Sequence, residues 1–158
     1  MRRWLKVVSI VAALLCAVPA QAGDDGKIVQ LGRKARALAE RMQAALDPDE
    51  CESITSCRTT MAAGILDDGT VLVATSDPED RFRSPVESIR REEGAVKAIG
   101  RKRHAEVKIL NYPSSTLFQR NTKVLVVAAG RPICELCEPA ILRDGVKIAS
   151  PCKSGRKY

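Results

Sequence analysis

Aromatic side chains are scarce in this chain: one Trp, two Tyr and two Phe make up 3% of its 158 residues. This scarcity disfavours functions that depend on stacked rings, such as platforms for nucleobases or cages for methylated cations. The sequence also lacks internal repeats at solenoid periods and low-complexity segments. Its 45% hydrophobic and 28% charged residues are typical of one globular domain. Wholesale disorder, a multidomain machine and a polytopic membrane protein are thereby excluded.

The first 22 residues have the three-part pattern of a secretory signal peptide. A short cationic start, 1–6, precedes an apolar stretch, 7–18, of about a dozen residues, which is too short to span a bilayer of roughly 30 Å. Small residues then follow in an A-x-A pattern that ends at Ala22. We therefore expect cleavage after Ala22, export to the periplasm or the extracellular space, and no stable membrane association afterwards. An uncleaved anchor is the alternative.

The positive charge of the chain is modest once this segment is removed. Loss of Arg2, Arg3 and Lys6 would reduce the formal net charge from +7 to +4, which permits association with nucleic acid without indicating it. A basic helix face could contact phosphates or simply be solvated; its residues are Arg33, Lys34, Arg36 and Arg41.

Five cysteines would remain after cleavage, and an odd number means that not all of them form disulfides. Cys51 and Cys57 are near enough in sequence to close a short loop, and an exported protein would tolerate this disulfide. Cys152 would then be free, or would replace one of them. The other two, Cys134 and Cys137, are three residues apart.

Hydrophobic periodicity and turn residues predict the order of the secondary structure. Apolar residues recur at steps of three and four over 27–46, which indicates an amphipathic helix. Two β-prone runs, 59–66 and 70–76, are joined by Asp67-Asp68-Gly69 and predict a hairpin. Further helices are expected near 85–100, 104–112 (ended by Pro113) and 134–144, and further strands at 123–129 and 146–149. This order predicts an α/β fold in which helices cover a mixed sheet.

Two short motifs supply residues that can bind a metal ion. The chain's single histidine lies in His104-Ala105-Glu106, and Cys134 and Cys137 follow thirty residues later. A catalytic zinc ion takes three protein ligands and leaves one position for water, whose pKa it lowers to about 7. Cys134 and Cys137 would present both sulfurs on one face at the start of a helix, where the helix dipole favours the thiolate. The sequence therefore predicts a zinc site formed by His104, Cys134 and Cys137.

Glu106 has a different role in this hypothesis. Two residues on a helix are separated by roughly 200° of rotation, so Glu106 and His104 can reach one point only beyond the first turn of a helix. A carboxylate in that place can take a proton from water and pass it to a ring nitrogen and then to a departing amine. The reaction implied is hydrolytic deamination of an amino-substituted nucleobase.

These motifs resemble those of the cytidine deaminase-like superfamily, and most of all the deaminase domains of bacterial polymorphic toxins. The matching segments are 61–76, 104–110 and 131–137, within a span of about residues 58–150. The resemblance implies a three-layer α/β/α sandwich with a five-stranded mixed sheet, an N-terminal hairpin and a zinc site at two helix N-termini. It implies His104, Cys134 and Cys137 as zinc ligands and Glu106 as the proton shuttle.

The sequence patterns and the resemblance together give the domain organisation and the candidate substrate contacts. A signal peptide at 1–22 and an amphipathic helix within 23–50 would precede a deaminase-like domain over 51–158 that ends in a short basic tail. Ser76 lies where nucleoside deaminases place a polar substrate contact, although a residue at a strand end often only satisfies a turn. Thr60 and Pro132 are further candidates. Ile133 separates Pro132 from the first cysteine, a spacing closer to the toxin branch than to the free-nucleoside enzymes.

The expected function is that of a secreted toxin that deaminates cytosine or adenine in nucleic acid. The resemblance, the export pattern and the basic residues 101–103 ahead of the histidine support it. A toxin of this kind implies an immunity protein in the producing cell. The alternatives are a secreted nucleoside or base deaminase used in scavenging, a non-catalytic zinc-stabilised binding module, and a thiol–disulfide protein.

Overall fold

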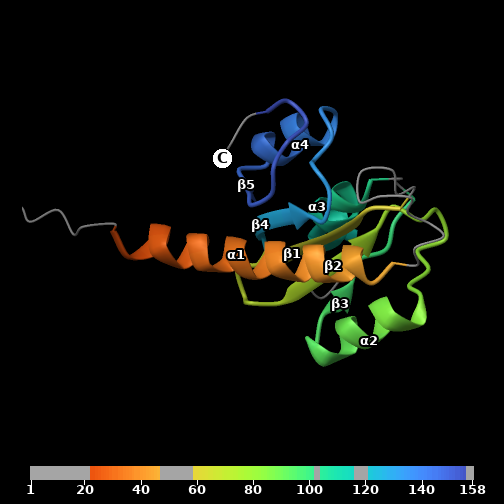
Figure 1. Cartoon of the computed structure of the whole chain (residues 1–158). Helices are drawn as coiled ribbons and strands as arrows, with labels where there is room; N and C mark the ends of the chain where they lie inside the picture. The colour runs from red at the N-terminus through yellow and green to blue at the C-terminus, as the bar shows by residue number, and fades with distance from the viewer. Residues whose placement is uncertain (1–21, 47–58, 102–103, 116–120, 156–158) are drawn as a thin grey trace, which may run out of the picture.

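The computed structural model describes residues 22–46, 59–101, 104–115 and 121–155 (Figure 1). The predicted signal peptide, except for Ala22, and the candidate disulfide between Cys51 and Cys57 lie outside these ranges. Within them, none of the helices combines the length and the apolar character needed to cross a membrane.

A five-stranded mixed sheet forms the centre of the fold, and this part of the prediction is confirmed. The strands are β1 (Met61–Leu66), β2 (Val71–Thr75), β3 (Val96–Lys97), β4 (Val124–Ala129) and β5 (Lys147–Ile148). Their order is β3-β2-β1-β4-β5. Strand β1 is antiparallel to β2 and β4, whereas β3 and β5 add in parallel at the two edges.

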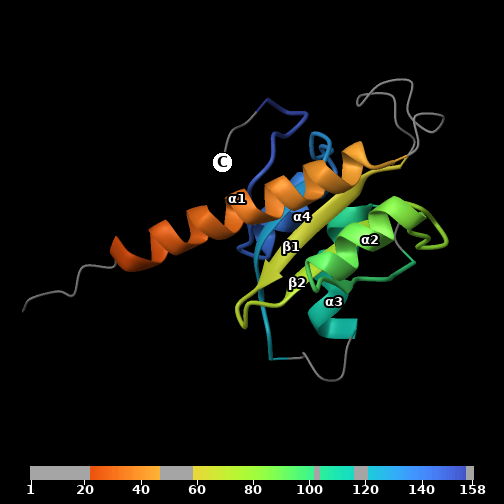
Figure 2. The same cartoon turned by 60° about the horizontal axis from the view of Figure 1, so that its bottom comes forward.

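The helices are α1 (Ala22–Ala44), α2 (Ser84–Glu92), α3 (Ala105–Ser115) and α4 (Cys137–Arg143). Helix α1 lies across β1 and β4, where Leu38 and Met42 pack in a core that also includes Val86 of α2 (Figures 1 and 2). On the other face, Ile109 of α3 and Ile141 of α4 belong to a second buried cluster. Because both faces are covered, all six residues of β1 are buried.

The predicted hairpin is confirmed, and its turn residues explain it. Gly69 has a φ of +88°, a conformation that costs glycine little because it has no Cβ. The Asp68 carboxylate accepts a hydrogen bond from the Thr70 backbone N–H at 2.8 Å. The Asp-Gly pair therefore sets the register in which Met61 lies opposite Thr75.

The predicted C-terminal ends of two helices are wrong. The helix expected over 85–100 ends at Glu92, because Gly94 adopts a φ of +59° and turns the chain into β3, a strand that periodicity did not predict. Helix α3 continues through Pro113 to Ser115. Proline removes one hydrogen bond there, but the Ser114 and Ser115 hydroxyls bond carbonyls one turn back and support the last turn.

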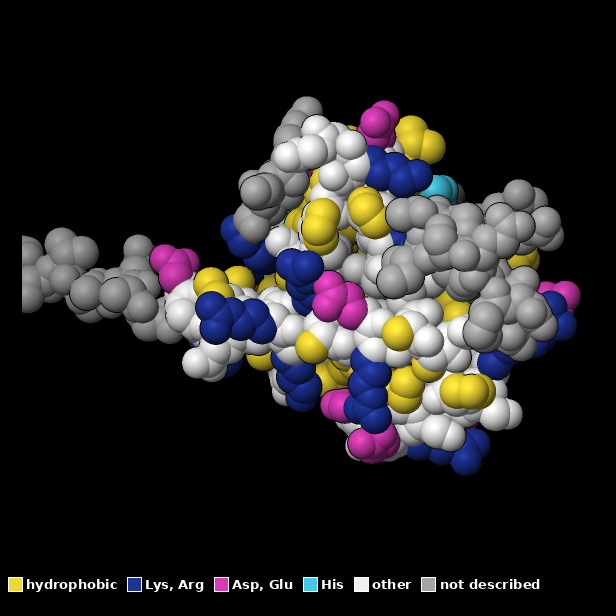
Figure 3. Space-filling model, viewed as in Figure 1, with side chains coloured by type: hydrophobic (Ala, Val, Ile, Leu, Met, Phe, Trp, Pro, Cys, Tyr) yellow, Lys and Arg dark blue, Asp and Glu magenta, His cyan; other side chains and the backbone are white. Residues whose placement is uncertain are grey.

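The basic face of α1 is partly neutralised by carboxylates. Arg36 pairs with Glu40 along the helix, and Arg41 pairs with Glu92 and Glu93 of the neighbouring α2 segment. Figure 3 shows basic and acidic side chains interspersed on this side of the molecule. These ion pairs favour the interpretation that this face is exposed to solvent, rather than the interpretation that it binds phosphate.

The close contact between Gly130 and α1 leads to a stability prediction. A Cβ at Gly130 would lie 2.4 Å from Gln43 Cβ and 2.7 Å from the Ala39 carbonyl oxygen. Gly130→Ala should therefore lower the free energy of unfolding by about 1–3 kcal/mol, as overpacking does. Gly26→Ala is the matched control, since a Cβ there meets nothing within 4 Å. Urea unfolding measures both, and equal midpoints for the two variants would contradict the prediction.

Candidate metal centre

The structure brings the three predicted metal ligands together. His104 lies directly before α3, Cys134 in the turn before α4, and Cys137 is the first residue of α4. Their ligand atoms all lie within 4.8 Å of one another. The Cys134 Sγ is 3.4 Å from His104 Nδ1 and 2.8 Å from Cys137 Sγ. One imidazole and two thiols thus converge on a single point and could hold a metal ion.

The helix that carries the cysteines begins later than predicted. Helix α4 starts at Cys137 instead of Cys134, and the backbone N–H of Cys137 donates to the Cys134 carbonyl at 3.0 Å in the preceding turn. The reason is that Ile133 is extended and pairs with Cys152, with Ile133 N–H bonded to the Pro151 carbonyl at 2.9 Å. The two sulfurs therefore come from a turn and a helix end.

Glu106 lies beside this group in the first turn of α3. Its side chain is buried, with 4% of the residue exposed, and its Oε2 accepts a hydrogen bond from Cys137 Sγ at 3.9 Å. Burial raises the pKa of Glu106, while its own backbone N–H, His104 and Cys137 act in the opposite direction to a smaller extent. A raised pKa means that the carboxylate binds a proton more strongly than an exposed one does, as a general base requires.

The Cys137 thiol is also perturbed. Burial raises the pKa of the Cys137 thiol, and the neighbouring Cys134 and Glu106 raise it further. A bound divalent cation would reverse this balance, because it stabilises thiolates directly. One imidazole and two thiolates form a borderline-soft ligand set that suits a metal such as zinc better than magnesium or calcium. The residues present therefore fit a metal ion such as zinc.

A cavity of about 240 Å³ opens beside the cluster. Its lining includes His104, Glu106 and Cys134 together with all three candidate substrate contacts, Thr60, Ser76 and Pro132. The site residues proposed from sequence thus share one cavity with the exception of Cys137, which is buried behind it.

The Ser76 hydroxyl does satisfy a local backbone group. Its Oγ accepts a hydrogen bond from the Thr60 N–H at 2.8 Å, and the Ser76 N–H donates to the Thr60 carbonyl at 2.9 Å. A serine hydroxyl has a proton of its own, so Ser76 can still donate into the cavity. The pairing fixes Thr60 and Ser76 to each other as one edge of the cavity.

Sequence reasoning missed two cationic residues that line this cavity, Arg131 and Lys153. Arg131 follows β4, and Lys153 belongs to the segment after β5 that looked like a polar tail. No local pattern places Lys153 here. It arrives because the 151–153 segment pairs with Ile133, and the Lys153 N–H donates to the Ile133 carbonyl at 2.9 Å.

Comparison with known proteins adds no assignment: no family model, curated protein or solved structure matches this chain. The site must therefore be interpreted from its geometry and chemistry.

Proposed function

We propose that this protein is a zinc-dependent deaminase of cytosine or adenine bases with the three-layer deaminase-like sandwich, and that it acts on nucleic acid as an exported toxin. The observation that carries the proposal is a buried carboxyl group, Glu106, next to a His/Cys/Cys group at the wall of a small cavity. A purely structural zinc site has four protein ligands and needs neither a buried acid nor a cavity.

In this proposal, three residues bind the metal ion and a fourth transfers protons. His104, Cys134 and Cys137 hold zinc, which when bound supplies a Lewis acid with one position open to water. Glu106 takes one proton from water in the cavity and gives it to the ring nitrogen as the water oxygen bonds to the ring carbon. It then takes the second proton of that oxygen and gives it to the exocyclic amine, which leaves as ammonia while the oxygen remains as the carbonyl of the product. Its burial supports this role, because a raised pKa makes the ionised carboxylate a stronger base.

Cationic residues near the site favour a substrate that carries phosphate. Arg131 and Lys153 line the small cavity itself. These two side chains supply positive charge where a phosphate next to the base could bind, which supports a nucleic-acid strand over a free nucleoside.

The proposal is tested by incubating the zinc-loaded protein with nucleosides, single strands and duplexes that contain cytosine or adenine. We expect release of ammonia from nucleic acid, with kcat/KM falling as salt is added because phosphate contacts release counterions. Deamination confined to mononucleosides would support the scavenging alternative instead. No deamination of any substrate by fully zinc-loaded protein would support the non-catalytic zinc module. If nucleic acid is deaminated, the producing cell needs an immunity protein that blocks the cavity.

A further inference from the structure

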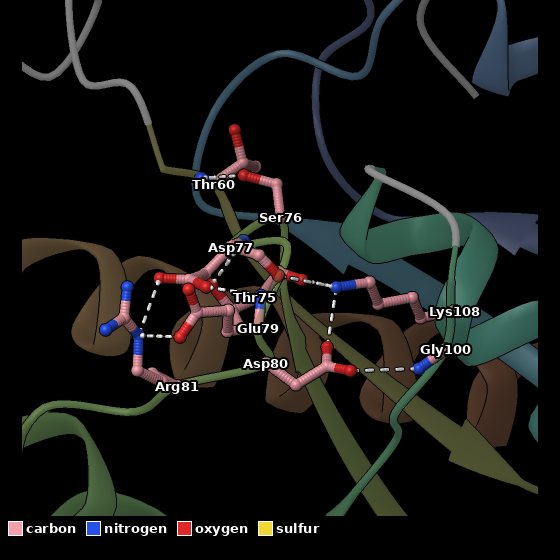
Figure 4. Close-up of polar contacts among 9 residues, drawn as sticks. All are labelled: Thr60, Thr75, Ser76, Asp77, Glu79, Asp80, Arg81, Gly100 and Lys108. Carbon is pink, nitrogen blue, oxygen red and sulfur yellow. Dashed lines mark hydrogen bonds and ion pairs between the residues drawn. The ribbon is translucent and has the colours of Figure 1, made fainter.

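Lys108 of α3 is the largest fully buried side chain in the described part of the molecule, with none of its side chain exposed to solvent. Its Nζ donates to three oxygens: the Thr75 carbonyl at 2.7 Å, the Asp77 carbonyl at 2.9 Å and Asp80 Oδ1 at 2.6 Å (Figure 4). An ammonium group has three donors, so its hydrogen-bonding capacity is filled. The proposed chemistry makes no use of this residue.

Two of these acceptors flank Ser76. Thr75 ends β2 and Asp77 begins the following loop, so the Lys108 ammonium holds the backbone on both sides of Ser76. Ser76 in turn exchanges two hydrogen bonds with Thr60 at the edge of the catalytic cavity. Helix α3, which carries Glu106, is thereby tied to the cavity edge that faces it (Figure 4).

Asp80 links Lys108 to the segment that leads to His104. Its Oδ1 pairs with Lys108, and its Oδ2 accepts a hydrogen bond from the Gly100 N–H at 3.1 Å. Asp80 has a φ of +55°, a left-handed conformation that is uncommon for a residue other than glycine. Such backbone persists where surrounding contacts determine it. Here the Asp80 N–H bond to the Asp77 carbonyl and both carboxylate contacts do so.

The burial of the Lys108–Asp80 ion pair is weak evidence that these two residues only stabilise the fold. Desolvation of two charges offsets most of their attraction, and an apolar pair of similar volume often serves stability as well. Hydrogen bonds, unlike apolar contacts, also depend on direction. Lys108 makes three of them to the 75–80 segment, and Asp80 makes one to Gly100, so together they fix where these two segments lie relative to α3. This geometry points to a role in placing the residues around the cavity.

We propose that Lys108 and Asp80 are positioning residues that hold the Thr60–Ser76 edge of the cavity at a fixed place relative to Glu106 and His104. The proposal rests on the proposed function, in which that edge contacts the base to be deaminated. Displacement of the edge would misalign the base and lower kcat while the three metal ligands stay in place.

The test uses the full chain with Lys108→Met, which keeps a similar length without the charge, Asp80→Asn, and the double variant. Lys147→Met, at an exposed lysine on β5, is the matched control. We expect each test variant to bind one zinc ion and to give the wild-type visible spectrum when loaded with cobalt. Their kcat should fall at least tenfold, with KM changing less than kcat. The double variant should be no worse than the single ones, because the two residues act as a unit.

Amide hydrogen exchange gives a second readout that needs no activity. Exchange at the Ser76 and Gly100 N–H groups should become at least tenfold faster in Lys108→Met, whereas the Gly130 N–H, bonded to the Met61 carbonyl, should keep its wild-type rate. The double variant replaces Lys108→Met if the lone Asp80 charge prevents folding. Zinc-loaded variants with wild-type kcat and wild-type exchange would overturn the proposal. If the wild-type protein deaminates nothing, the proposed function fails, and unchanged exchange then overturns the positioning role as well.

Discussion

Glu106→Gln should abolish deamination while zinc stays bound. The amide has the shape of the carboxyl group but cannot move a proton, and general acid–base catalysis contributes about 10²- to 10⁴-fold to rates. Since this residue handles every proton in the proposed reaction, we expect a loss in kcat near the upper end of that range. The free energy of unfolding should not fall, because burial already disfavours the ionised form of Glu106. Ammonia release and elemental analysis of the same samples give both quantities.

Glu138→Gln provides the control for this variant. Glu138 is as deeply buried as Glu106, at 3% against 4% exposed, but it does not line the catalytic cavity, and its Oε2 accepts a hydrogen bond from the Ser154 hydroxyl. We expect it to retain deaminase activity. Full activity in Glu106→Gln would reject the proton-shuttle role, and loss of zinc in that variant would assign Glu106 to metal retention instead.

The parts of the structure that local sequence determines were predictable. The hairpin follows from β-prone runs on either side of an Asp-Gly turn, and the turn glycine has the positive φ that such a turn requires. The convergence of His104, Cys134 and Cys137 was predicted from residue types and order along the chain, with a family resemblance as its support. The chain has no other histidine that could serve as the nitrogen ligand.

The features that the sequence did not reveal depend on contacts between distant segments. Strand β3 is two residues long and exists because Val96 pairs with Leu72, so no local periodicity indicates it. The start of α4 is delayed by the pairing of Ile133 with Cys152. Such pairings involve residues about twenty positions apart, outside the window from which helix and strand patterns are recognised.

The burial of Lys108 also depends on contacts with a distant segment and could not be predicted from local sequence. On a helix with Val107, Ile109 and Leu110 as its apolar residues, a lysine is expected to face solvent. It is instead buried, because two backbone carbonyls and the Asp80 carboxylate in the 75–80 segment accept hydrogen bonds from its ammonium group. Only the folded arrangement of the loop and α3 supplies these acceptors, so the residue could not have been distinguished from a surface lysine.

Cys137→Ala should lower the affinity for zinc by at least about a hundredfold, since even the residues behind metal ligands contribute 10–100-fold. It removes one of the three candidate ligands, and the proposed deaminase activity should be lost with the metal. In the wild-type protein, the raised pKa of Cys137 means that zinc must displace a proton, so affinity should increase as pH rises through the neutral range. Competition with a chromophoric chelator at several pH values measures both effects, and a pH-independent affinity would contradict the second.

Cys152→Ala is the control for Cys137→Ala. Cys152 is buried at 5% exposed but does not belong to the His/Cys/Cys group, so this variant should keep wild-type zinc affinity. Thiol titration of the native protein distinguishes the remaining alternative. A metal centre protects Cys134 and Cys137 from alkylation until a chelator is added, whereas a disulfide protects them until a reductant is added. Protection that only a reductant removes, in protein without bound metal, would favour the thiol–disulfide function over the deaminase.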